Sequence, residues 1–249
     1  RVRNGMDAVG CNAYFKIVGE EDGYVIDEWG VKYKENAEIV KHPVAGPIKT
    51  FADLKTYRPM DPEASHRFEE IKEVVSKYKG ETAITFHHRA AFMWSAYLMD
   101  LDHLLMSLYA DPELVEAVLD MVLEINIAIV RRAIREGAEV VLLGDDYANN
   151  SGPMLSPQMF GQFIVPRLKK MVDAIHAEGA YVVKHSDGNL MPIIDMILST
   201  GIDAINPIEP AAGMDIKVIK EKYGSDYCII GNIDCGELLC NKEPEDVEM

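Results

Sequence analysis

The spacing of hydrophobic and polar positions is regular from about residue 67 onward. Continuous apolar runs alternate there with stretches whose apolar positions lie three and four residues apart, as in amphipathic helices. The apolar runs are TAITFHH, EVVLLGDDY, YVVKHSDGN, DAINPIEP and CIIGNIDCG. Because parallel strands need crossover connections and are buried on both faces, this alternation predicts an α/β fold with a parallel sheet covered by helices.

The helices between these runs carry start and stop signals. The longest begins at Asp111, a suitable N-cap followed by Pro112, and ends near Gly137. A second begins after Ser156 and ends at Gly179. Both are long enough to cross over between neighbouring parallel strands.

The first 66 residues lack this alternation. Residues 23–34, GYVIDEWGVKYK, have the pattern of a hairpin that turns at Trp29 and Gly30. Residues 42–62 are punctuated by prolines, as in a surface connection. We therefore expect an irregular N-terminal extension over residues 1–66, followed by a barrel over residues 67–249.

Polar side chains gather where the apolar runs end. They are His87, His88, Arg89, Asp145, Asp146, Tyr147, Lys184, His185, Asp187, Asn206, Glu209, Asn232 and Asp234. In a (β/α)8 TIM barrel, the carboxyl ends of the strands share one rim and converge on one pocket. An open doubly wound sheet would bring fewer of them together, and no glycine-rich phosphate loop follows the first run. We favour the TIM barrel.

Composition narrows the class of partner. A formal net charge of −16 over 249 residues, with a pI near 4.8, excludes nucleic acid or an anionic membrane surface as the main partner, because both need a basic face. No apolar run is long enough to span a bilayer. Four scattered cysteines indicate reduced thiols. These features predict a cytoplasmic enzyme with a small-molecule substrate.

Each polar residue also has a structural interpretation. A single histidine at a strand end is more often a hydrogen-bonded structural residue than a ligand, and Asp187 followed by Gly188 and Asn189 is also typical of a turn. Adjacent carboxylates such as Asp145 and Asp146 repel each other, so they need a cation, a proton or donors nearby. The recurrence at five strand ends favours a site.

Several motifs resemble the uroporphyrinogen decarboxylase superfamily from residue 42 onward. They are HPVAGPIKTFADLKTYRPMDP, GDDYANNSGPMLSPQMFGQFIVPRLKKMVDAIHAEGA, KHSDGN, INPIEPAAGMD and GNIDCGELL. The resemblance implies a (β/α)8 barrel that is usually used as a homodimer. It also implies that this chain stops before the last strand and helix of such a barrel.

The superfamily implies two chemistries. One is cofactor-free removal of acetate carboxyls from uroporphyrinogen, in which an aspartate bonds the pyrrole NH groups and arginines hold the eight carboxylates. The other is methyl transfer involving a corrinoid carried by a partner protein, often with zinc. In the zinc enzymes the strand matching YVVKHSDGN carries His-x-Cys; here His185 matches the histidine and Asp187 occupies the cysteine position. His185 and Asp187 are therefore the predicted zinc ligands.

The acidic strand ends would repel a polyanion, and the arginine-rich N-terminal motif of the decarboxylases is absent. We therefore expect corrinoid-linked methyl transfer on a small methylated or methoxylated compound, with uroporphyrinogen decarboxylation as the alternative and a non-catalytic partner subunit as a third. The predicted catalytic residues are His87, Asp146, Tyr147 and His185. The predicted substrate-binding residues are His88, Arg89, Asp145, Lys184, Asn206, Glu209, Asn232 and Asp234.

Overall fold

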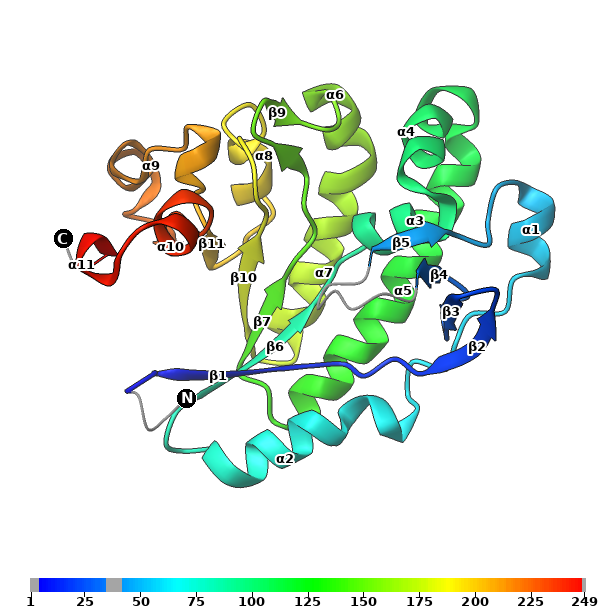
Figure 1. The fold of residues 1–249 in the computed structure, drawn as a ribbon, viewed down its shortest axis with the longest axis horizontal. Coiled ribbons are helices and arrows are strands. Elements are labelled where there is room, and N and C mark those ends of the chain that lie inside the picture. Colours follow the sequence, from blue (N-terminus) through cyan, green and yellow to red (C-terminus); the bar gives the residue numbers. More distant parts are fainter. Residues whose placement is uncertain (1–4, 35–41, 248–249) are drawn as a thin grey trace.

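A parallel six-stranded sheet forms the centre of the computed structural model, which describes residues 5–34 and 42–247 (Figure 1). In spatial order the strands are β1 (Ala8–Asn12), β6 (Ala83–His88), β7 (Val140–Leu143), β10 (Tyr181–His185), β11 (Ala204–Asn206) and β12 (Cys228–Ile229). All neighbouring pairs are parallel. The α/β prediction is confirmed, and all five apolar runs supply strands.

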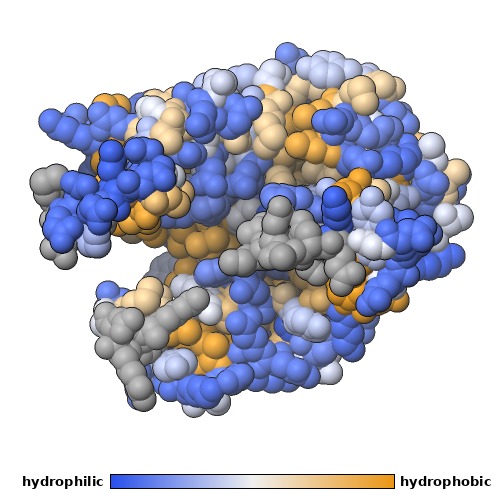
Figure 2. Space-filling view, in the orientation of Figure 1, coloured by the Kyte–Doolittle hydropathy of each residue, from blue (hydrophilic) through white to orange (hydrophobic). Residues whose placement is uncertain are grey.

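The sheet is open within the described part of the chain, because β1 and β12 each pair with one strand there. Figure 2 shows the open side as a hollow, with hydrophobic residues at its base, between the surface over α9 to α11 and the surface over β1. The bounds of these helices are α9 (Ile216–Tyr223), α10 (Glu237–Asn241) and α11 (Pro244–Val247).

Strand β1 comes from the segment that we expected to be an extension outside the barrel. It pairs with β6 in register, from Ala8 opposite Ala83 to Asn12 opposite His87. Its sequence, AVGCN, is short and alternates between buried and half-buried positions, so it contains no continuous apolar run. The boundary at residue 66 therefore does not separate the central sheet from what precedes it.

Helices cover the outer face of the sheet. The longest, α5 (Pro112–Glu136), is capped by the Asp111 side chain, which accepts a hydrogen bond from the Leu114 amide, and it ends at Gly137 with a positive φ of 124°. Its predicted start and stop are confirmed. The apolar stripe of this helix is buried, and the helix packs against α7 (Val165–Ala177).

The N-terminal residues also form a small antiparallel sheet. Its strands are β2 (Ile17–Glu21), β3 (Tyr24–Asp27), β4 (Lys32–Lys34) and β5 (Pro43–Ala45). The predicted hairpin is confirmed: it joins β3 to β4, and the Asp27 carboxylate accepts hydrogen bonds from the amides of Trp29 and Val31. Buried Arg67 pairs with Glu28 at 2.6 Å and donates to the carbonyls of Asp61 and Tyr14, which connects the loop after β3 to the segment that follows β1.

The remaining elements connect or flank these layers. They are α1 (Phe51–Thr56), η2 (Ser65–Phe68), α2 (Glu69–Tyr78), α3 (Phe92–Met99), α4 (Leu101–Ala110), β8 (Ala148–Asn149), β9 (Gly152–Pro153), α6 (Pro157–Met159), the π-helical η3 (Phe160–Ile164), α8 (Ile194–Leu198) and η4 (Pro210–Ala212). Of the helices in the described ranges, none has both the length and the apolar character needed to cross a membrane.

Candidate functional site

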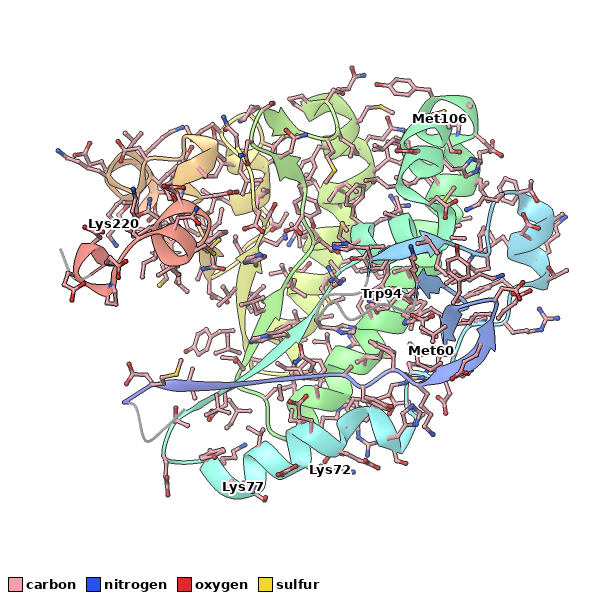
Figure 3. All side chains as sticks on the ribbon, viewed as in Figure 1. Met60, Lys72, Lys77, Trp94, Met106 and Lys220 are labelled. Atoms are coloured by element: carbon pink, nitrogen blue, oxygen red, sulfur yellow. The ribbon has the colours of Figure 1, made fainter. Side chains whose placement is uncertain are left out.

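A cavity of about 390 Å³ lies at the carboxyl ends of β1, β6, β7 and β10. Its lining residues come from these ends and from α3, on which Trp94 is labelled near the middle of the molecule in Figure 3. They are Asn12, Ala13, Phe15, His87, His88, Arg89, Trp94, Leu142, Gly144, Asp146 and His185. The cavity thus brings together residues that are far apart in the sequence.

One histidine and two carboxylates converge at this rim. Nε2 of His185 lies 3.9 Å from Oδ1 of Asp146 and 3.7 Å from Oδ1 of Asp187. The Asp187 amide donates a hydrogen bond to Oδ1 of Asp146 at 3.2 Å, which fixes the two strand ends together. One potential ligand atom from each of the three residues lies within 4.8 Å of the others. We call these residues the acidic triad.

The orientation of the His185 ring follows from Asn206 at the end of β11. Nδ1 of His185 lies 2.7 Å from Oδ1 of Asn206, and because an amide oxygen only accepts, Nδ1 carries the proton. Nε2 therefore faces the two carboxylates. The Asp187 carboxylate raises the pKa of His185, and His185 in turn lowers the pKa of Asp187. The site thus favours positive charge, a proton or a metal ion, at Nε2.

Asp145, adjacent to Asp146, has a structural role. Its carboxylate is fully buried and accepts hydrogen bonds from the amides of Ala90, Ala91 and Met93 at 2.8 to 3.1 Å. These contacts fix the start of α3. Asp145, a predicted substrate-binding residue, therefore does not line the cavity, because its oxygens are buried and already bonded.

Tyr147 is also buried, with an exposed fraction of 2%, and packs against Phe92 and Phe160. Burial raises the pKa of its hydroxyl, which has no hydrogen-bond partner in the part of the chain that the structure describes. Side chains alternate in direction along an extended chain, so Asp146 points into the cavity while its two neighbours point away. Tyr147 therefore does not line the cavity, contrary to the predicted catalytic role.

Lys184 lies beneath the rim and does not line the cavity. Its fully buried Nζ donates to the carbonyls of Leu143, Asp145 and His185, and it lies 4.2 Å from the centre of the Tyr147 ring. Burial lowers the pKa of Lys184 to about 8. Lys184, a predicted substrate-binding residue, thus joins the ends of β7 and β10.

The two neighbouring histidines of β6 have different environments. His87 faces the cavity with Nε2 3.3 Å from the Thr85 hydroxyl, and a Cβ at Gly10 would lie only 2.7 Å from this nitrogen. Gly10 therefore provides the space for the imidazole. His88 borders the cavity but is 7% exposed, and its Nε2 donates to Oδ1 of Asn126 at 3.0 Å.

We expect His88 to make the protein sensitive to acid. Burial lowers its pKa from 6.5 to about 4, so the unfolded chain binds the proton first as the pH falls. Protonation of His88 does not lower the free energy of unfolding above pH 6.5. As the pH falls from there to about 4, the free energy of unfolding decreases progressively, by about 3 kcal/mol in total. Urea unfolding between pH 7.5 and 4 should show a shallower pH dependence for His88→Gln, which keeps a donor for Asn126. Parallel curves for the two proteins would refute this assignment.

The other predicted residues divide between the rim and its surroundings. Arg89 lines the cavity, and its Nη1 donates to the Gly144 carbonyl at 2.8 Å. Oε2 of Glu209 accepts from the Gly188 amide at 2.6 Å, beside the acidic triad. Asn232 and Asp234 follow β12 and do not line the cavity; Asp234 accepts from two amides at the start of α10.

Sequence reasoning missed Asn12, Phe15 and Trp94, which line the cavity. Asn12 ends the strand that the pattern did not reveal. The two aromatic residues look like core residues in the sequence, and only their contact across 79 positions, with ring centres 5.2 Å apart, places them at the site.

Comparisons with known proteins give one family. The sequence signature of the family described as uroporphyrinogen decarboxylase (URO-D) matches residues 4–249. A methylcobamide:CoM methyltransferase of Methanosarcina acetivorans is 26% identical, over 86% of this chain and 61% of that protein. A uroporphyrinogen decarboxylase of Trichodesmium erythraeum is 25% identical, over 79% of this chain and 56% of that protein. The chain thus spans about three fifths of the length of these relatives.

A solved structure shares the fold. The structure of a methyltransferase from Methanosarcina mazei superposes with a TM-score of 0.71 at 20% sequence identity, covering 92% of this chain and 65% of that one. At this identity the likeness concerns the fold alone.

Proposed function

The chain belongs to the uroporphyrinogen decarboxylase family, and from this premise we propose that it takes part in corrinoid-linked methyl transfer on a small methylated or methoxylated compound. The observation that carries the proposal is the acidic triad at the cavity rim, with Nε2 of His185 facing two carboxylates. The similarity to a methylcobamide:CoM methyltransferase supports the same chemistry.

The donor set of the triad suits a zinc ion. Zinc binds imidazole nitrogen and carboxylate oxygen at similar distances, and a ligating histidine usually donates its other N–H to an oxygen, as His185 does to Asn206. Asp146, His185 and Asp187 would hold the ion. When bound, zinc supplies Lewis acidity that lowers the pKa of a thiol or hydroxyl, so that this group reacts or leaves as an anion during methyl transfer.

The chain's own side chains would then orient the substrate and move protons. Asn206 keeps Nδ1 of His185 protonated, which leaves Nε2 available. His87 faces the same cavity and is the proposed carrier of a proton between the reacting group and solvent. We also propose that the sheet is part of an eight-stranded barrel, that the enzyme acts as a homodimer, and that a separate protein carries the corrinoid.

Uroporphyrinogen decarboxylation is the second candidate, because decarboxylases are among the relatives at similar identity. Its substrate has eight carboxylates. Within the described residues, the cavity wall offers one guanidinium, that of Arg89, and it carries Asp146 close to Asp187. Like charges in a partly desolvated cavity repel, so this wall supports a substrate of low negative charge.

Metal content and two activity assays test the proposal. We expect wild-type protein to retain zinc after gel filtration and His185→Ala to lose zinc affinity by more than about 10-fold. His176→Ala is the matched control, because His176 also lies 2.9 Å from a carboxylate, that of Asp203, but outside the acidic triad. Methyl exchange with a corrinoid protein should depend on His185 in the same way.

Three results would contradict the proposal and favour an alternative. Release of carbon dioxide from uroporphyrinogen without metal or corrinoid would establish the decarboxylase. Zinc binding that is equal in wild type and His185→Ala would place any metal elsewhere. The absence of both activities in a folded, zinc-binding protein would favour a non-catalytic partner subunit.

A further inference from the structure

We propose that the substrate of this cavity carries a single carboxylate, which binds Arg89, and a flat apolar body, which lies against Phe15 and Trp94. This inference rests on the proposed function for the identity of the reacting end, which faces the acidic triad. It names Arg89 as the residue that determines specificity.

Arg89 has the features of an anion-binding residue. Its half-buried guanidinium is held by two contacts: Nη1 donates to the Gly144 carbonyl at 2.8 Å, and Cζ lies 5.4 Å from the centre of the Tyr97 ring. None of the ion pairs between described residues includes Arg89. The fork has five N–H groups, so several remain for a planar carboxylate.

An aromatic wall stands in the same cavity. The Trp94 indole stacks on Trp29 with ring centres 4.7 Å apart and an interplanar angle of 17°, and Phe15 packs edge-on against Trp94 at 5.2 Å. Trp29 is fully buried, so it supports Trp94 from behind. A wall that is ordered before binding loses little conformational entropy when a ligand arrives. Trp94 is 7% exposed and Phe15 is half-buried, so the part of this surface that remains open suits a small apolar group such as one flat ring.

The charges of the cavity determine the orientation of the ligand. Without a bound cation Asp146 repels an anionic group from the triad, whereas Arg89 attracts it. With zinc on the triad, the two carboxylates would balance the charge of the ion, and Arg89 would remain the residue that attracts the anion. A carboxylate on Arg89 therefore leaves the opposite, uncharged end of the substrate for His185 and its neighbours. The cavity volume of about 390 Å³ is in the range of small-molecule sites, and one guanidinium matches one carboxylate.

A pair of ring compounds that differ in charge tests this inference. Calorimetric titration with benzoate and with uncharged benzamide, both in the presence of a chelator, measures recognition of the carboxylate without metal binding. We expect wild type to bind benzoate more tightly than benzamide. Arg89→Gln should weaken benzoate binding by roughly 10- to 100-fold and leave benzamide unchanged, because charged hydrogen bonds to the carboxylate are lost.

Two further variants complete the experiment. Arg89→Lys should recover part of the benzoate affinity, because it keeps the charge but loses the fork. Arg58→Gln removes an exposed arginine whose hydrogen bonds, among the described residues, go to backbone carbonyls, and it should bind as wild type does. Melting temperatures measured for all variants serve to check that each is folded.

The inference is overturned if Arg89→Gln binds benzoate as wild type does, or if it loses benzoate and benzamide equally. Tighter binding of benzenesulfonate than of benzoate would overturn the choice of a carboxylate. These titrations involve neither methyl transfer nor metal, so their outcome is independent of the assays of the proposed function. If the protein transfers methyl groups but binds benzoate and benzamide equally, the proposed function stands and this inference is wrong.

Discussion

Replacement of Asp145 by alanine should lower the free energy of unfolding by about 3–5 kcal/mol, while the same change at Asp146 alters it by less than about 1 kcal/mol. The Asp145 carboxylate is fully buried and satisfies the amides of Ala90, Ala91 and Met93. Its removal leaves three amides without this acceptor, two of them in buried residues. Asp146 is half-buried and accepts one hydrogen bond, from the Asp187 amide, so little stability depends on it.

Urea unfolding at neutral pH measures both values, and zinc content measured in parallel should show the reverse order. Asp146→Ala should lose metal, whereas any Asp145→Ala that remains folded should keep it. Asp145→Asn is the conservative control and should be intermediate, because one amide oxygen replaces two carboxylate oxygens. Equal destabilisation by the two alanine variants would mean that the neighbouring carboxylates share one role.

The second large effect concerns the turn after His185. Gly188 has a φ of +88°, and a Cβ there would lie 2.6 Å from the carbonyl carbon of Ala148. In Gly188→Ala the left-handed backbone costs about 1–2 kcal/mol, and the clash with backbone adds about 1–3 kcal/mol. Because Asp187 precedes this residue, the shift should also separate Asp187 from His185 and weaken metal binding.

Gly179→Ala is a matched control for Gly188→Ala. Gly179 has nearly the same φ, +86°, but an added Cβ would meet nothing within 4 Å. The control should therefore lose only the backbone part, about 1–2 kcal/mol, and keep its zinc. Thermal unfolding of both variants gives the comparison. If Gly179→Ala is destabilised as much as Gly188→Ala, the clash with Ala148 has no effect.

The regular part of the fold could be predicted from the sequence, because each strand and helix there has its own local pattern. The α5 helix has a cap, a stripe and a glycine stop within one stretch of chain. Strand β1 was not readable, because its alternation, one residue buried and the next half-buried, lacks the apolar run that marks the other strands. It became part of the sheet through pairing with β6, a contact across 75 positions.

The sequence predicted which strand ends form the candidate site, but it did not predict which side chains at those ends face the cavity. GDDY offers three polar side chains in a row, and no sequence signal gives the phase that turns Asp146 inward and Asp145 and Tyr147 away. The triad of Asp146, His185 and Asp187 depends on the register between β7 and β10, which only the folded sheet determines.

The stacked indoles also make the cavity observable by optical spectroscopy. Trp29 and Trp94 are the two tryptophans of the chain, so its entire indole fluorescence comes from Trp94, which lines the cavity, and from Trp29, which stacks behind it. The two indoles, with ring centres 4.7 Å apart and an interplanar angle of 17°, are close enough for their electronic transitions to couple. A ligand that packs on Trp94 would change the emission intensity directly. The native protein therefore reports occupancy of its own site without a dye or a label.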